Sequence, residues 1–440
     1  MTHVVWLIIL LCAILGHLAM VRAVINRGYE LGLPQRVWQA MVISLIAAAV
    51  VGPMLIVRFV GPRGGGWRDV PIGWRIYVGA CVAAFVIGVI VLIIRKRDAR
   101  IPAQISSRSD VHDYAQAVST PAQSKSAVSA LARLPGNEIY SVEINQRELR
   151  IARLPAQWDG ISILHITDLH MNGTPDRRFF EWATDRCSEL RCDIATMTGD
   201  VMDNLDVIEW LPTTLGKIDA PLGKYFVLGN HDLHAGGDAM RAAMEGIGWQ
   251  SVAGRVMTKL FRDAQLVIGG TETPWAGTLP EIGMASRRPI AQRRAAPLEG
   301  LEDVETAPDP RTSREQRTAP TGAALWAAGE NEGRERGTAT TTTTPTIPTP
   351  AEFCVLLSHA PHLVHWARER NVDLVLAGHL HGGQIQWPII GPIAGGRFHS
   401  GLFDLPPTIM HVGRGLGQMA PIRWGCRPEI TKLVLRAARQ

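Results

Sequence analysis

Five short apolar runs in this sequence end in side chains that commonly bind metal ions. The first is "ILHITDLHMNG", in which Asp168 and His170 follow the apolar residues with one residue between them. One run of this kind is weak evidence, because buried strands often end in a polar turn. The other runs are "DIATMTGDVMD", "KYFVLGNHD", "FCVLLSHAP" and "VDLVLAGHLHGG". Their terminal polar residues are Asp200, Asp203, Asn230, His231, Asp232, His359, His379 and His381.

These side chains form a chemically coherent set of ligands. Carboxylates, an amide oxygen and imidazoles, with no thiolate, suit Mn, Fe or Zn in an open coordination sphere. Two metal ions about 3.5–4 Å apart need a bridging carboxylate, and a hydroxide held between them is a nucleophile at neutral pH. Five such endings in one chain therefore indicate a hydrolytic metal site rather than five ordinary turns.

The elements that must position these residues are strands alternating with helices. Each run begins with a short β-branched or Leu-rich stretch typical of a buried strand, and it breaks beside Gly, Ser or Thr. Helical patterns at 178–190 and 238–246 fall between the runs. In such folds, ligands gather beyond the carboxyl ends of the strands. We therefore predict an α/β domain in which all five polar clusters converge.

The order D-x-H, GDxxD, GNHD, SHxP and GHxH resembles that of the calcineurin-like metallophosphoesterases. The segments "GHLHGGQIQWPIIGP" and "GRGLGQMAPIRWGCRPEI" are similar, more narrowly, to a membrane-anchored bacterial subgroup of that family. Relatives of this subgroup include transmembrane proteins with a metallophosphoesterase domain. The resemblance covers about residues 139–435, apart from an insert, and implies two stacked β-sheets flanked by helices.

The resemblance also implies a role for each polar residue. His231 would face the phosphate and stabilise the transition state or protonate the leaving oxygen. Asp232 would orient the imidazole of His231, and Asp203 would support the ligands from behind. Two divalent or mixed-valence metal ions (Mn, Fe or Zn) would share Asp200 as a bridge. The ligands would be Asp168, His170, Asp200 and His381 for one ion, and Asp200, Asn230, His359 and His379 for the other.

Several further polar residues have simpler interpretations. His165 lies inside the first strand and is predicted to be a buried core histidine. His362 and His365 follow the SHxP turn at helical spacing, which favours a helix face over a third metal site. His234, His399 and Arg423 stay open as residues that line the substrate cleft.

Three long apolar runs, at 4–21, 37–57 and 76–94, lie within the first 97 residues. Each is close to the roughly 20 residues that a helix needs to cross a bilayer. Trp38, Trp67, Trp74 and Tyr77 lie near their ends, as interfacial anchors do. No Lys or Arg precedes the first run and no small-x-small cleavage site follows it, so we predict an anchor rather than a signal peptide. Residues 1–97 are therefore predicted to be an all-α transmembrane region with three helices.

The distribution of Lys and Arg predicts the orientation in the cell membrane. Counting near the span ends gives eight basic residues on the side that carries the C-terminal part and four on the other. The excess predicts a cytoplasmic catalytic domain. This inference depends on the number of spans, because one span more or fewer would reverse it.

Two segments have the composition of flexible chain. Residues 98–137 are rich in Ser, Ala and Gln and are predicted to be a linker. Within the predicted metallophosphoesterase domain, 138–440, residues 282–350 are rich in Arg, Glu, Ala and Pro and end in "TATTTTTPTIPTP". Such a segment buries too little apolar surface to fold, so we predict a disordered insert.

Composition narrows the functional classes. The net charge of +5 is small for 440 residues, and no basic stripe interleaved with aromatics occurs, so nucleic-acid binding is not expected. The six cysteines show no CxxC spacing. The main hypothesis is a membrane-anchored dimetal phosphoesterase in which metal-bound hydroxide cleaves a phosphodiester or pyrophosphate bond.

The function of the protein stays open among three possibilities. By analogy with relatives, the substrate could be lipid-linked, such as UDP-2,3-diacylglucosamine or a phospholipid. The alternatives are a tethered nucleotide phosphodiesterase and a catalytically silent membrane sensor or scaffold. The sequence does not distinguish among oligomeric states, between monoester and diester preference, or among the candidate metals.

Overall fold

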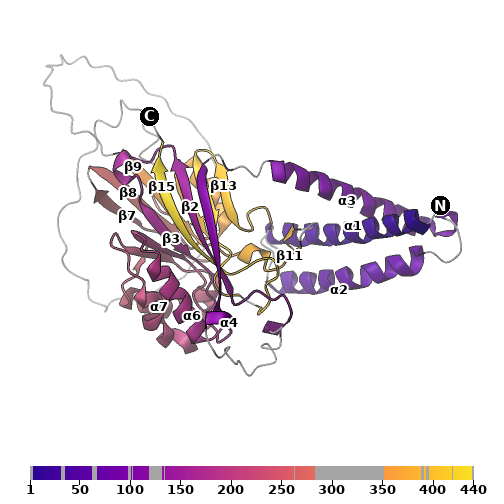
Figure 1. The fold of residues 1–440 in the computed structure, drawn as a ribbon, viewed down its shortest axis with the longest axis horizontal. Coiled ribbons are helices and arrows are strands. Elements are labelled where there is room, and N and C mark those ends of the chain that lie inside the picture. Colours follow the sequence, from indigo (N-terminus) through magenta and orange to yellow (C-terminus); the bar gives the residue numbers. More distant parts are fainter. Residues whose placement is uncertain are drawn as a thin grey trace, which may run out of the picture. The chain divides into compact units, whose positions relative to one another are not determined.

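The computed structural model describes residues 3–30, 35–61, 67–97, 101, 103–117, 131–132, 134–261, 263–282, 351–387, 391–392, 396–418 and 420–438. The N-terminal part consists of three long helices: α1 (His3–Glu30), α2 (Gln35–Val60) and α3 (Ile72–Arg97). The remaining described elements form two β-sheets with flanking helices (Figure 1). This architecture confirms the predicted α/β class with two stacked sheets, preceded by an all-α region.

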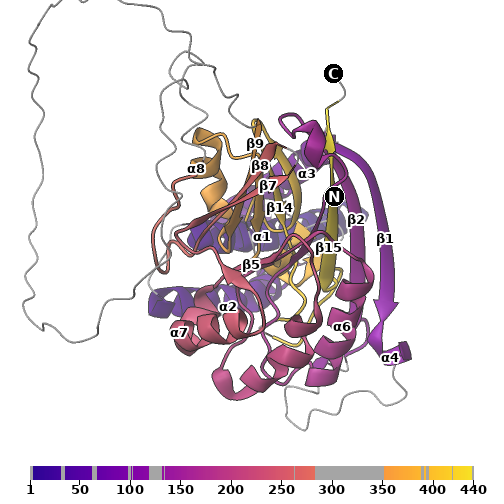
Figure 2. The same cartoon turned by 90° about the vertical axis from the view of Figure 1, so that its left-hand side faces the viewer.

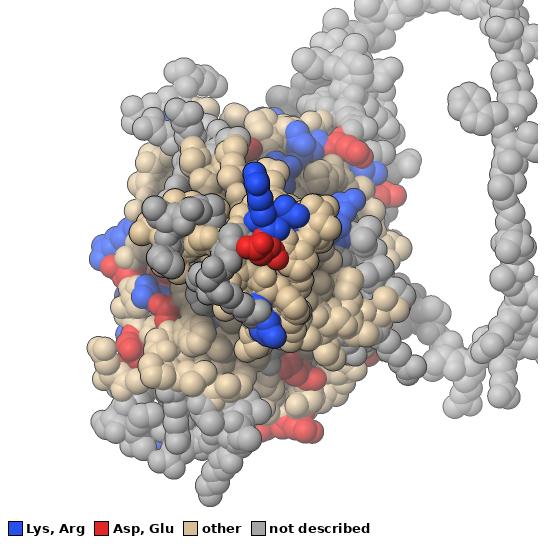
Figure 3. All heavy atoms as spheres, turned by 90° about the vertical axis from the view of Figure 1, so that its right-hand side faces the viewer, with Lys and Arg blue, Asp and Glu red and all other residues tan. Residues whose placement is uncertain are grey.

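The three N-terminal helices are long and apolar enough to cross a membrane. The candidate spans are Val4–Ile25, Ile43–Val60 and Ile72–Val91, which confirms the predicted number. Large apolar side chains point outward from the helices, with exposed fractions of 59 % for Leu7, 68 % for Ile43 and 67 % for Ile76. Most of the described surface on the face in Figure 3 is uncharged, with charged side chains in small groups. Such outward-facing apolar residues are the surface that lipid would cover.

His17, a polar residue of α1, contacts both other helices. His17 Nδ1 lies 2.7 Å from the hydroxyl oxygen of Tyr77 in α3, and His17 Nε2 lies 2.9 Å from the carbonyl oxygen of Ala48 in α2. A polar group at membrane depth is costly unless it is hydrogen-bonded. Both nitrogens of His17 have partners, so this histidine stabilises the packing of the three helices.

The first sheet has seven strands, and the strands on one side of it are parallel. Strands β3, β4, β5 and β6 run in the same direction, whereas β15 is antiparallel to β3. The carboxyl ends of β3, β4 and β5 therefore meet at one edge of the sheet. In spatial order the strands are β1 (Gln104–Asp113), β2 (Ser141–Ile151), β15 (Glu429–Ala437), β3 (Ser162–Ile166), β4 (Ile194–Thr198), β5 (Lys224–Val227) and β6 (Gln250–Ser251).

The second sheet has six strands with a parallel centre. Strands β8, β9, β10 and β14 are mutually parallel, and the outer strands β7 and β13 are antiparallel to their neighbours. A separate short pair is formed by β11 (Gln386–Trp387) and β12 (Gly391–Pro392). In spatial order the strands are β13 (Gly401–Leu405), β14 (Thr408–Val412), β10 (Leu374–Ala377), β9 (Ala351–Ser358), β8 (Ala264–Thr271) and β7 (Val256–Phe261).

Three apolar clusters hold these layers together. The cluster between the sheets joins residues such as Ile163 and Val227 of the first sheet to Val355 and Leu376 of the second. A second cluster lies between the first sheet and the helices α6 (Arg177–Glu189) and α7 (Asn230–Gly246), and a third lies between the second sheet and α8 (Val364–Glu369) (Figure 2). The site-bearing edges of both sheets are thus fixed by packing on both faces.

The linker predicted over 98–137 is wrong for residues 104–117. Residues Gln104–Asp113 form β1, an edge strand paired antiparallel with β2, and Tyr114–Ala117 form the short helix α4. Tyr114 is buried and packs edge-on against Phe179 of α6. An edge strand is held by main-chain hydrogen bonds, so its polar composition resembled that of a linker. Residues 118–130, also part of that prediction, lie outside the described residues.

The corrected boundary shortens the connection between the helices and the sheets. Helix α3 ends at Arg97 and β1 begins at Gln104, which leaves the six residues 98–103 between them. Even fully extended, a connection of this length spans at most about 25 Å. The sheet domain is therefore held within a short distance of the membrane end of α3, and the 40-residue tether that the composition predicted does not exist.

Of the insert predicted over residues 282–350, the structure describes only Ile282. Residues 283–350 lie outside the described part of the chain, so their disorder stays a prediction. Ile282, placed in the insert by its composition, is 1 % exposed and packs in the cluster with Val267 and Leu356. The ordered part of the domain therefore includes Ile282 and resumes with β9 at Ala351.

Candidate metal centre

The candidate ligands come from the loops that follow five parallel strands. The loops after β3, β4 and β5 belong to the first sheet, and those after β9 and β10 belong to the second. Three groups of side chains bring donor atoms within 4.8 Å of one another: Asp168 with His170 and His381, His170 with Asp200 and His231, and Asp200 with His359 and His379. The structure therefore brings together side chains that are more than 200 positions apart in sequence.

Most of these ligand positions have an unusual backbone conformation. Positive φ angles are uncommon for residues other than glycine and cost free energy unless the surroundings enforce them. Hydrogen bonds to neighbouring loops hold this conformation: the backbone N–H of Asp168 donates to Gly199 O (2.9 Å), and that of His170 donates to Asp200 O (3.0 Å). The φ angles are 50° at Asp168, 43° at His170, 55° at Asp200, 75° at His379 and 49° at His381.

Two glycines allow the loops to approach this closely. A Cβ atom at Gly229 would lie 2.1 Å from Asp200 Oδ1, and a Cβ atom at Gly199 would lie 2.7 Å from His359 Nδ1. Gly199 also has φ of +89°, which favours glycine. Any larger residue at either position would displace a candidate ligand.

The first group of donor atoms surrounds one point. His170 Nε2 lies 3.0 Å from His381 Nε2 and 3.6 Å from Asp200 Oδ2, and His381 Nε2 lies 3.4 Å from Asp168 Oδ1. All four residues are buried. Adjacent ligands bound at about 2.1 Å to a single ion are about 3 Å apart, so these separations match the geometry that a metal ion requires.

The second group has an additional feature that fits a bound cation. His359 Nε2 lies 3.1 Å from both Asp200 Oδ2 and His379 Nδ1. Asn230 Oδ1 is buried and has no hydrogen-bond partner among the described residues. A buried polar atom without a partner costs free energy, so such atoms are rare unless an ion or a ligand satisfies them. The donor set therefore fits a metal ion here.

Hydrogen bonds from the far ring nitrogens fix the tautomers of two histidines. His359 Nδ1 donates to the carbonyl oxygen of Thr198 (2.6 Å), which leaves Nε2 directed at Asp200. His170 Nδ1 donates to Asp203 Oδ1 (2.6 Å), which leaves Nε2 directed at His381. Metal-binding histidines typically have such a partner behind them, because it orients the ring and raises its basicity.

Charge pairing and burial shift the pKa values of these groups in opposite directions. Burial alone would raise the pKa of Asp200, but the imidazoles of His359 and His170 hold it well below its usual range. Burial would lower the pKa of His359, yet Asp200 raises it to about 9. Burial and the neighbouring His359 lower the pKa of His379 to about 3. A bound cation would require both imidazoles to be neutral, because a ligating histidine nitrogen must be deprotonated.

His231 lies beside this cluster and is partly exposed. Its backbone N–H donates to Asp200 Oδ1 (2.9 Å), and its Nδ1 lies 2.9 Å from Asp203 Oδ1. The side chain is 26 % exposed, whereas that of His170 is fully buried. Burial opposes protonation of His231, but Asp203 and Asp200 outweigh this effect and raise its pKa.

The role predicted for Asp232 is wrong. Its carboxylate does not orient His231, because it accepts hydrogen bonds from the backbone N–H groups of Gly229 (3.0 Å), Val201 (2.8 Å) and Met202 (3.1 Å). These bonds cap the N-terminus of α7 and fix the loop that carries Asp200. Burial and the charge of Asp200 raise the pKa of Asp232 to about 7. Asp203 takes the orienting position, with one carboxylate oxygen shared between His170 and His231.

Trp275 lies against the centre, and the sequence did not indicate this. Its ring centroid lies 5.0 Å from that of His379 and 5.4 Å from that of His359. It follows β8 in the segment "TETPWAG", which contains none of the metal-ligand patterns. An indole at this position shields the imidazoles from water on one side, and only the packing of the loop after β8 places it there.

The remaining sequence candidates lie away from the metal ligands or serve the core. His165 is buried, as predicted, and bonds to Thr198 and His411. Arg423 is fully buried and donates to the carbonyl oxygen of Arg414 (2.8 Å), so it fixes a loop rather than lining a cleft. His362 and His365 are exposed, which is the helix-face position that their spacing favoured.

The segment of the chain that carries the candidate ligands matches a known protein family. Residues 161–383, about half of the 440, match the family described as calcineurin-like phosphoesterase. The matched segment contains all the candidate ligands.

Three relatives share most of their length with this chain. It is 24 % identical over 310 residues to an uncharacterized metallophosphoesterase, YkuE, of Bacillus subtilis (68 % of this chain, 87 % of YkuE). It is 24 % identical over 415 residues to a transmembrane protein with metallophosphoesterase domain of Danio rerio (92 % and 82 %). It is 26 % identical over 323 residues to the UDP-2,3-diacylglucosamine pyrophosphatase LpxG of Chlamydia trachomatis (66 % and 91 %).

Proposed function

The chain belongs to the calcineurin-like phosphoesterase family, and from this premise we propose that it is a membrane-anchored dimetal hydrolase of lipid-linked phosphodiesters or pyrophosphates. The observation that carries the proposal is the convergence of seven buried or half-buried donor residues from both sheets, with Asn230 Oδ1 buried and unpaired among the described residues. No such set is needed to stabilise a fold, because each buried charge or amide in it is costly without an ion.

The residues that would hold the two ions follow from the two groups of donors. Asp200 faces both groups, so it would bridge them. Bound ions of this kind polarise phosphoryl oxygens and lower the pKa of a bound water. The first ion would be held by Asp168, His170, Asp200 and His381, and the second by Asp200, Asn230, His359 and His379.

His231 supplies a proton or hydrogen bond to the reacting phosphate. Its Nδ1 is bonded to the ionised Asp203, so Nε2 is the nitrogen left to face a substrate. From there it would donate to a phosphoryl oxygen or to the leaving oxygen. Asp203 keeps the ring in this orientation, and Trp275 covers the imidazoles of His359 and His379 on another side.

The short connection to the membrane supports a lipid-linked substrate. With six residues between α3 and β1, the sheet domain stays near the bilayer surface. A tether of this kind raises the effective concentration toward bilayer substrates to about millimolar, and soluble substrates gain nothing from it. The relative LpxG is named for action on a lipid-bearing nucleotide sugar, which supports the same class. The excess of basic residues beside the predicted spans supports an activity on the cytoplasmic side.

The first test separates an enzyme from a silent scaffold. Full-length protein, purified in detergent and stripped of metal, would be reloaded with Mn, Fe or Zn singly. We expect metal-dependent hydrolysis of bis-p-nitrophenyl phosphate with at least one of them. A folded protein that binds the ions and hydrolyses nothing would contradict the proposal and favour the sensor or scaffold.

The second test concerns the lipid. Full-length protein and a lipid-linked pyrophosphate would be placed in the same vesicles, or in separate vesicles at equal total concentrations. We expect a rate at least tenfold higher in the same vesicles, because only there does the tether act. Bis-p-nitrophenyl phosphate is the control and should give equal rates in both arrangements. Equal rates on the lipid would instead favour a tethered nucleotide phosphodiesterase.

A further inference from the structure

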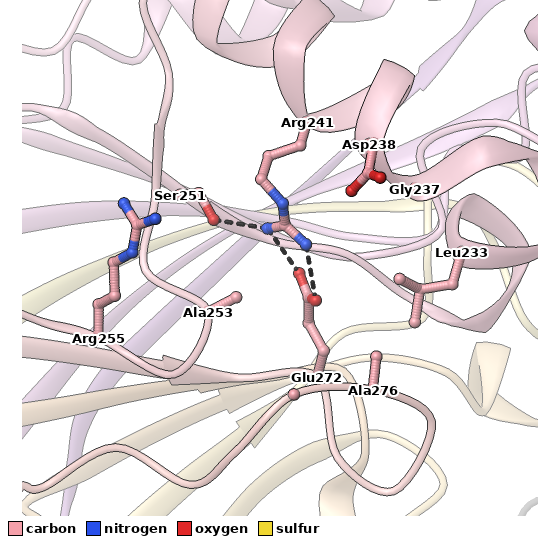
Figure 4. Close-up of a pocket in the computed structure, with 10 residues that line it drawn as sticks. Leu233, Gly237, Asp238, Arg241, Ser251, Ala253, Arg255, Glu272 and Ala276 are labelled. Atoms are coloured by element: carbon pink, nitrogen blue, oxygen red, sulfur yellow. Dashed lines mark hydrogen bonds and ion pairs between the residues drawn. The ribbon is translucent and has the colours of Figure 1, made fainter. Parts of the chain in front are cut away.

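A buried ion pair joins the two sheets at the edge that carries the candidate metal centre. Glu272 directly follows β8 of the second sheet, and Arg241 belongs to α7, which packs on the first sheet (Figure 4). Arg241 donates from its two terminal nitrogens to Glu272 Oε1 (3.0 Å) and Oε2 (2.8 Å), and it also donates to Ser251 Oγ at the end of β6 (2.7 Å). Glu272 is 2 % exposed, so its carboxylate is held inside the domain.

The carboxylate of Glu272 also holds the turn that follows β5. Leu228 is the first residue after β5, and its backbone N–H donates to Glu272 Oε1 (2.9 Å). Leu228 is fully buried, and a buried N–H without an acceptor costs free energy, so this bond fixes the direction of the chain. Asn230 lies two residues further along. The position of its amide oxygen therefore depends on the bond between Leu228 and Glu272.

The main chain of Glu272 positions Trp275. Its carbonyl oxygen accepts from the backbone N–H groups of Trp275 (3.1 Å) and Ala276 (3.1 Å), which turns the chain back after β8. The indole of Trp275 then lies against the imidazoles of His359 and His379, with ring centroids 5.4 Å and 5.0 Å away. Through its neighbours, Glu272 thus supports three of the four side chains that would hold the second ion.

We propose that Glu272 is a positioning residue for the second metal ion and that Arg241 keeps its carboxylate in place. The inference rests on the proposed function and deepens it. Glu272 acts through Asn230 and through Trp275, and it contacts neither ion. Among the described residues, its hydrogen bonds do not reach the ligands that belong to the first ion alone, which are Asp168, His170 and His381. Loss of its side chain should therefore weaken one ion and spare the other.

Asp373 offers a matched control. This carboxylate is 3 % exposed, pairs with Arg153 (2.8 Å) and accepts from the backbone N–H of Cys354 (2.9 Å), so its surroundings are of the same kind as those of Glu272. It directly precedes β10, whereas His379 follows the other end of that strand. Substitution at either position should lower stability, but only substitution of Glu272 should change metal binding.

The experiment measures Mn²⁺ binding by metal-stripped full-length protein in detergent, by titration and by electron paramagnetic resonance. Glu272→Leu has no acceptor for Leu228 and should weaken the binding of one ion about 10- to 100-fold. The spin-coupled signal should then be missing at Mn²⁺ concentrations that saturate the wild type. Glu272→Gln keeps an amide oxygen and should lie between the wild type and Glu272→Leu. Asp373→Leu should bind both ions as the wild type does.

Double variants identify the ion that is affected. His381→Gln removes a ligand of the first ion alone, so the ion that remains is the second. Adding Glu272→Leu should weaken this remaining ion by the same 10- to 100-fold, roughly. His359→Gln removes a ligand of the second ion alone, and there Glu272→Leu should leave the affinity of the remaining ion unchanged.

Wild-type Mn²⁺ affinities in folded Glu272→Leu would overturn the inference. So would an equal loss of both ions, or the same loss in Asp373→Leu, because either result indicates a general effect on the fold. Unfolding midpoints show which variants fold, and if Glu272→Leu does not, Glu272→Gln decides between the same outcomes. A wild-type protein that binds two ions but hydrolyses no phosphoester would contradict the proposed function and leave the positioning role intact. A wild-type protein that binds fewer than two ions would contradict both.

Discussion

The two sheets contribute different chemistry to the same centre. The loops after β3, β4 and β5 of the first sheet supply every oxygen donor, whereas the loops after β9 and β10 of the second supply only imidazoles. The donors of the first sheet are Asp168, His170, Asp200 and Asn230, and those of the second are His359, His379 and His381. Both carboxylates, and therefore all the negative charge of the ligand set, lie on one sheet.

The second sheet is also positioned by the first. The backbone N–H of His379 donates to Asp168 Oδ1 (3.0 Å), and His359 Nδ1 donates to the carbonyl oxygen of Thr198 (2.6 Å). The first sheet thus fixes the charge and the geometry, and the imidazoles of the second complete the coordination. Loss of the bridging carboxylate Asp200 on the first sheet should therefore affect both metal ions, whereas loss of an imidazole on the second should affect one.

The largest expected effect comes from the bridging carboxylate. Asp200→Asn should lose both metal ions and lower kcat roughly 10³-fold or more, since several kcal/mol of stabilisation disappear. His359→Gln should lose one ion and keep the other. Elemental analysis of both variants, alongside hydrolysis rates, tests the asymmetry. Equal metal loss in Asp200→Asn and His359→Gln would contradict the proposed difference between the two sheets.

Substitution of His231 should lower the rate of hydrolysis without changing the metal content. It lies on the first sheet's side of the centre but binds no ion in this account. His231→Ala should keep both ions and lower kcat by about 10²–10³, as expected for loss of a transition-state donor. A variant stripped of its metal would show that His231 is a ligand, contrary to this assignment.

Substitutions of Asp203 and Asp232 should affect metal affinity and stability differently. Asp203→Asn removes the negative charge behind His170 and His231, and should weaken metal affinity by about 10- to 100-fold. Asp232→Asn replaces one of the two oxygens that accept from backbone N–H groups with a donor, so it should lower the unfolding midpoint more than it changes metal affinity at equal occupancy. Metal titrations and thermal unfolding would be measured for both. The reverse pattern would restore the orienting role to Asp232.

The smallest expected effect is a pH dependence of stability that arises from His411, a buried histidine between the two sheets. Burial lowers the pKa of His411 to about 4, although Glu429 opposes this. Between about pH 6.5 and 4 the unfolded chain therefore binds a proton that the folded chain does not, and stability falls as the pH falls. The loss is up to about 1.4 kcal/mol per pH unit for one group.

His411→Gln cannot bind this proton. The fall in its unfolding midpoint from pH 7 to pH 5 should therefore be smaller than in the wild type. His365→Gln, at an exposed position, is the control and should keep the wild-type dependence. An undiminished fall in His411→Gln would assign the acid sensitivity to other groups.

The sequence predicted the strand ends well because buried parallel strands have a local signature. An apolar run that stops at Gly or Thr and continues into Asp, Asn or His is readable without any long-range contact, as at Asp168 and Asp200. Convergence of these ends then follows from the direction of parallel strands. The two-sheet architecture came from the resemblance to the phosphoesterase family, and the three N-terminal spans came from the length of their apolar runs.

The features that the sequence missed depend on contacts that have no local signature. Strand β1 is polar and is held through its main chain by β2, so its composition indicated a linker. The sequence assigned the orienting role to Asp232, but Asp232 caps the start of α7 and Asp203 lies beside the ring of His231. Trp275 reaches the centre because the loop after β8 packs against the ends of β9 and β10, which no short motif records.

The most direct test of the dimetal centre is the metal stoichiometry of the wild-type protein. Full-length protein in detergent would be stripped, loaded with Mn²⁺ and analysed for metal content and by electron paramagnetic resonance. The account predicts two Mn²⁺ per chain and a spin-coupled signal, because ions that share Asp200 would lie about 3.5–4 Å apart. A single ion per folded chain, or two ions without coupling, would contradict it.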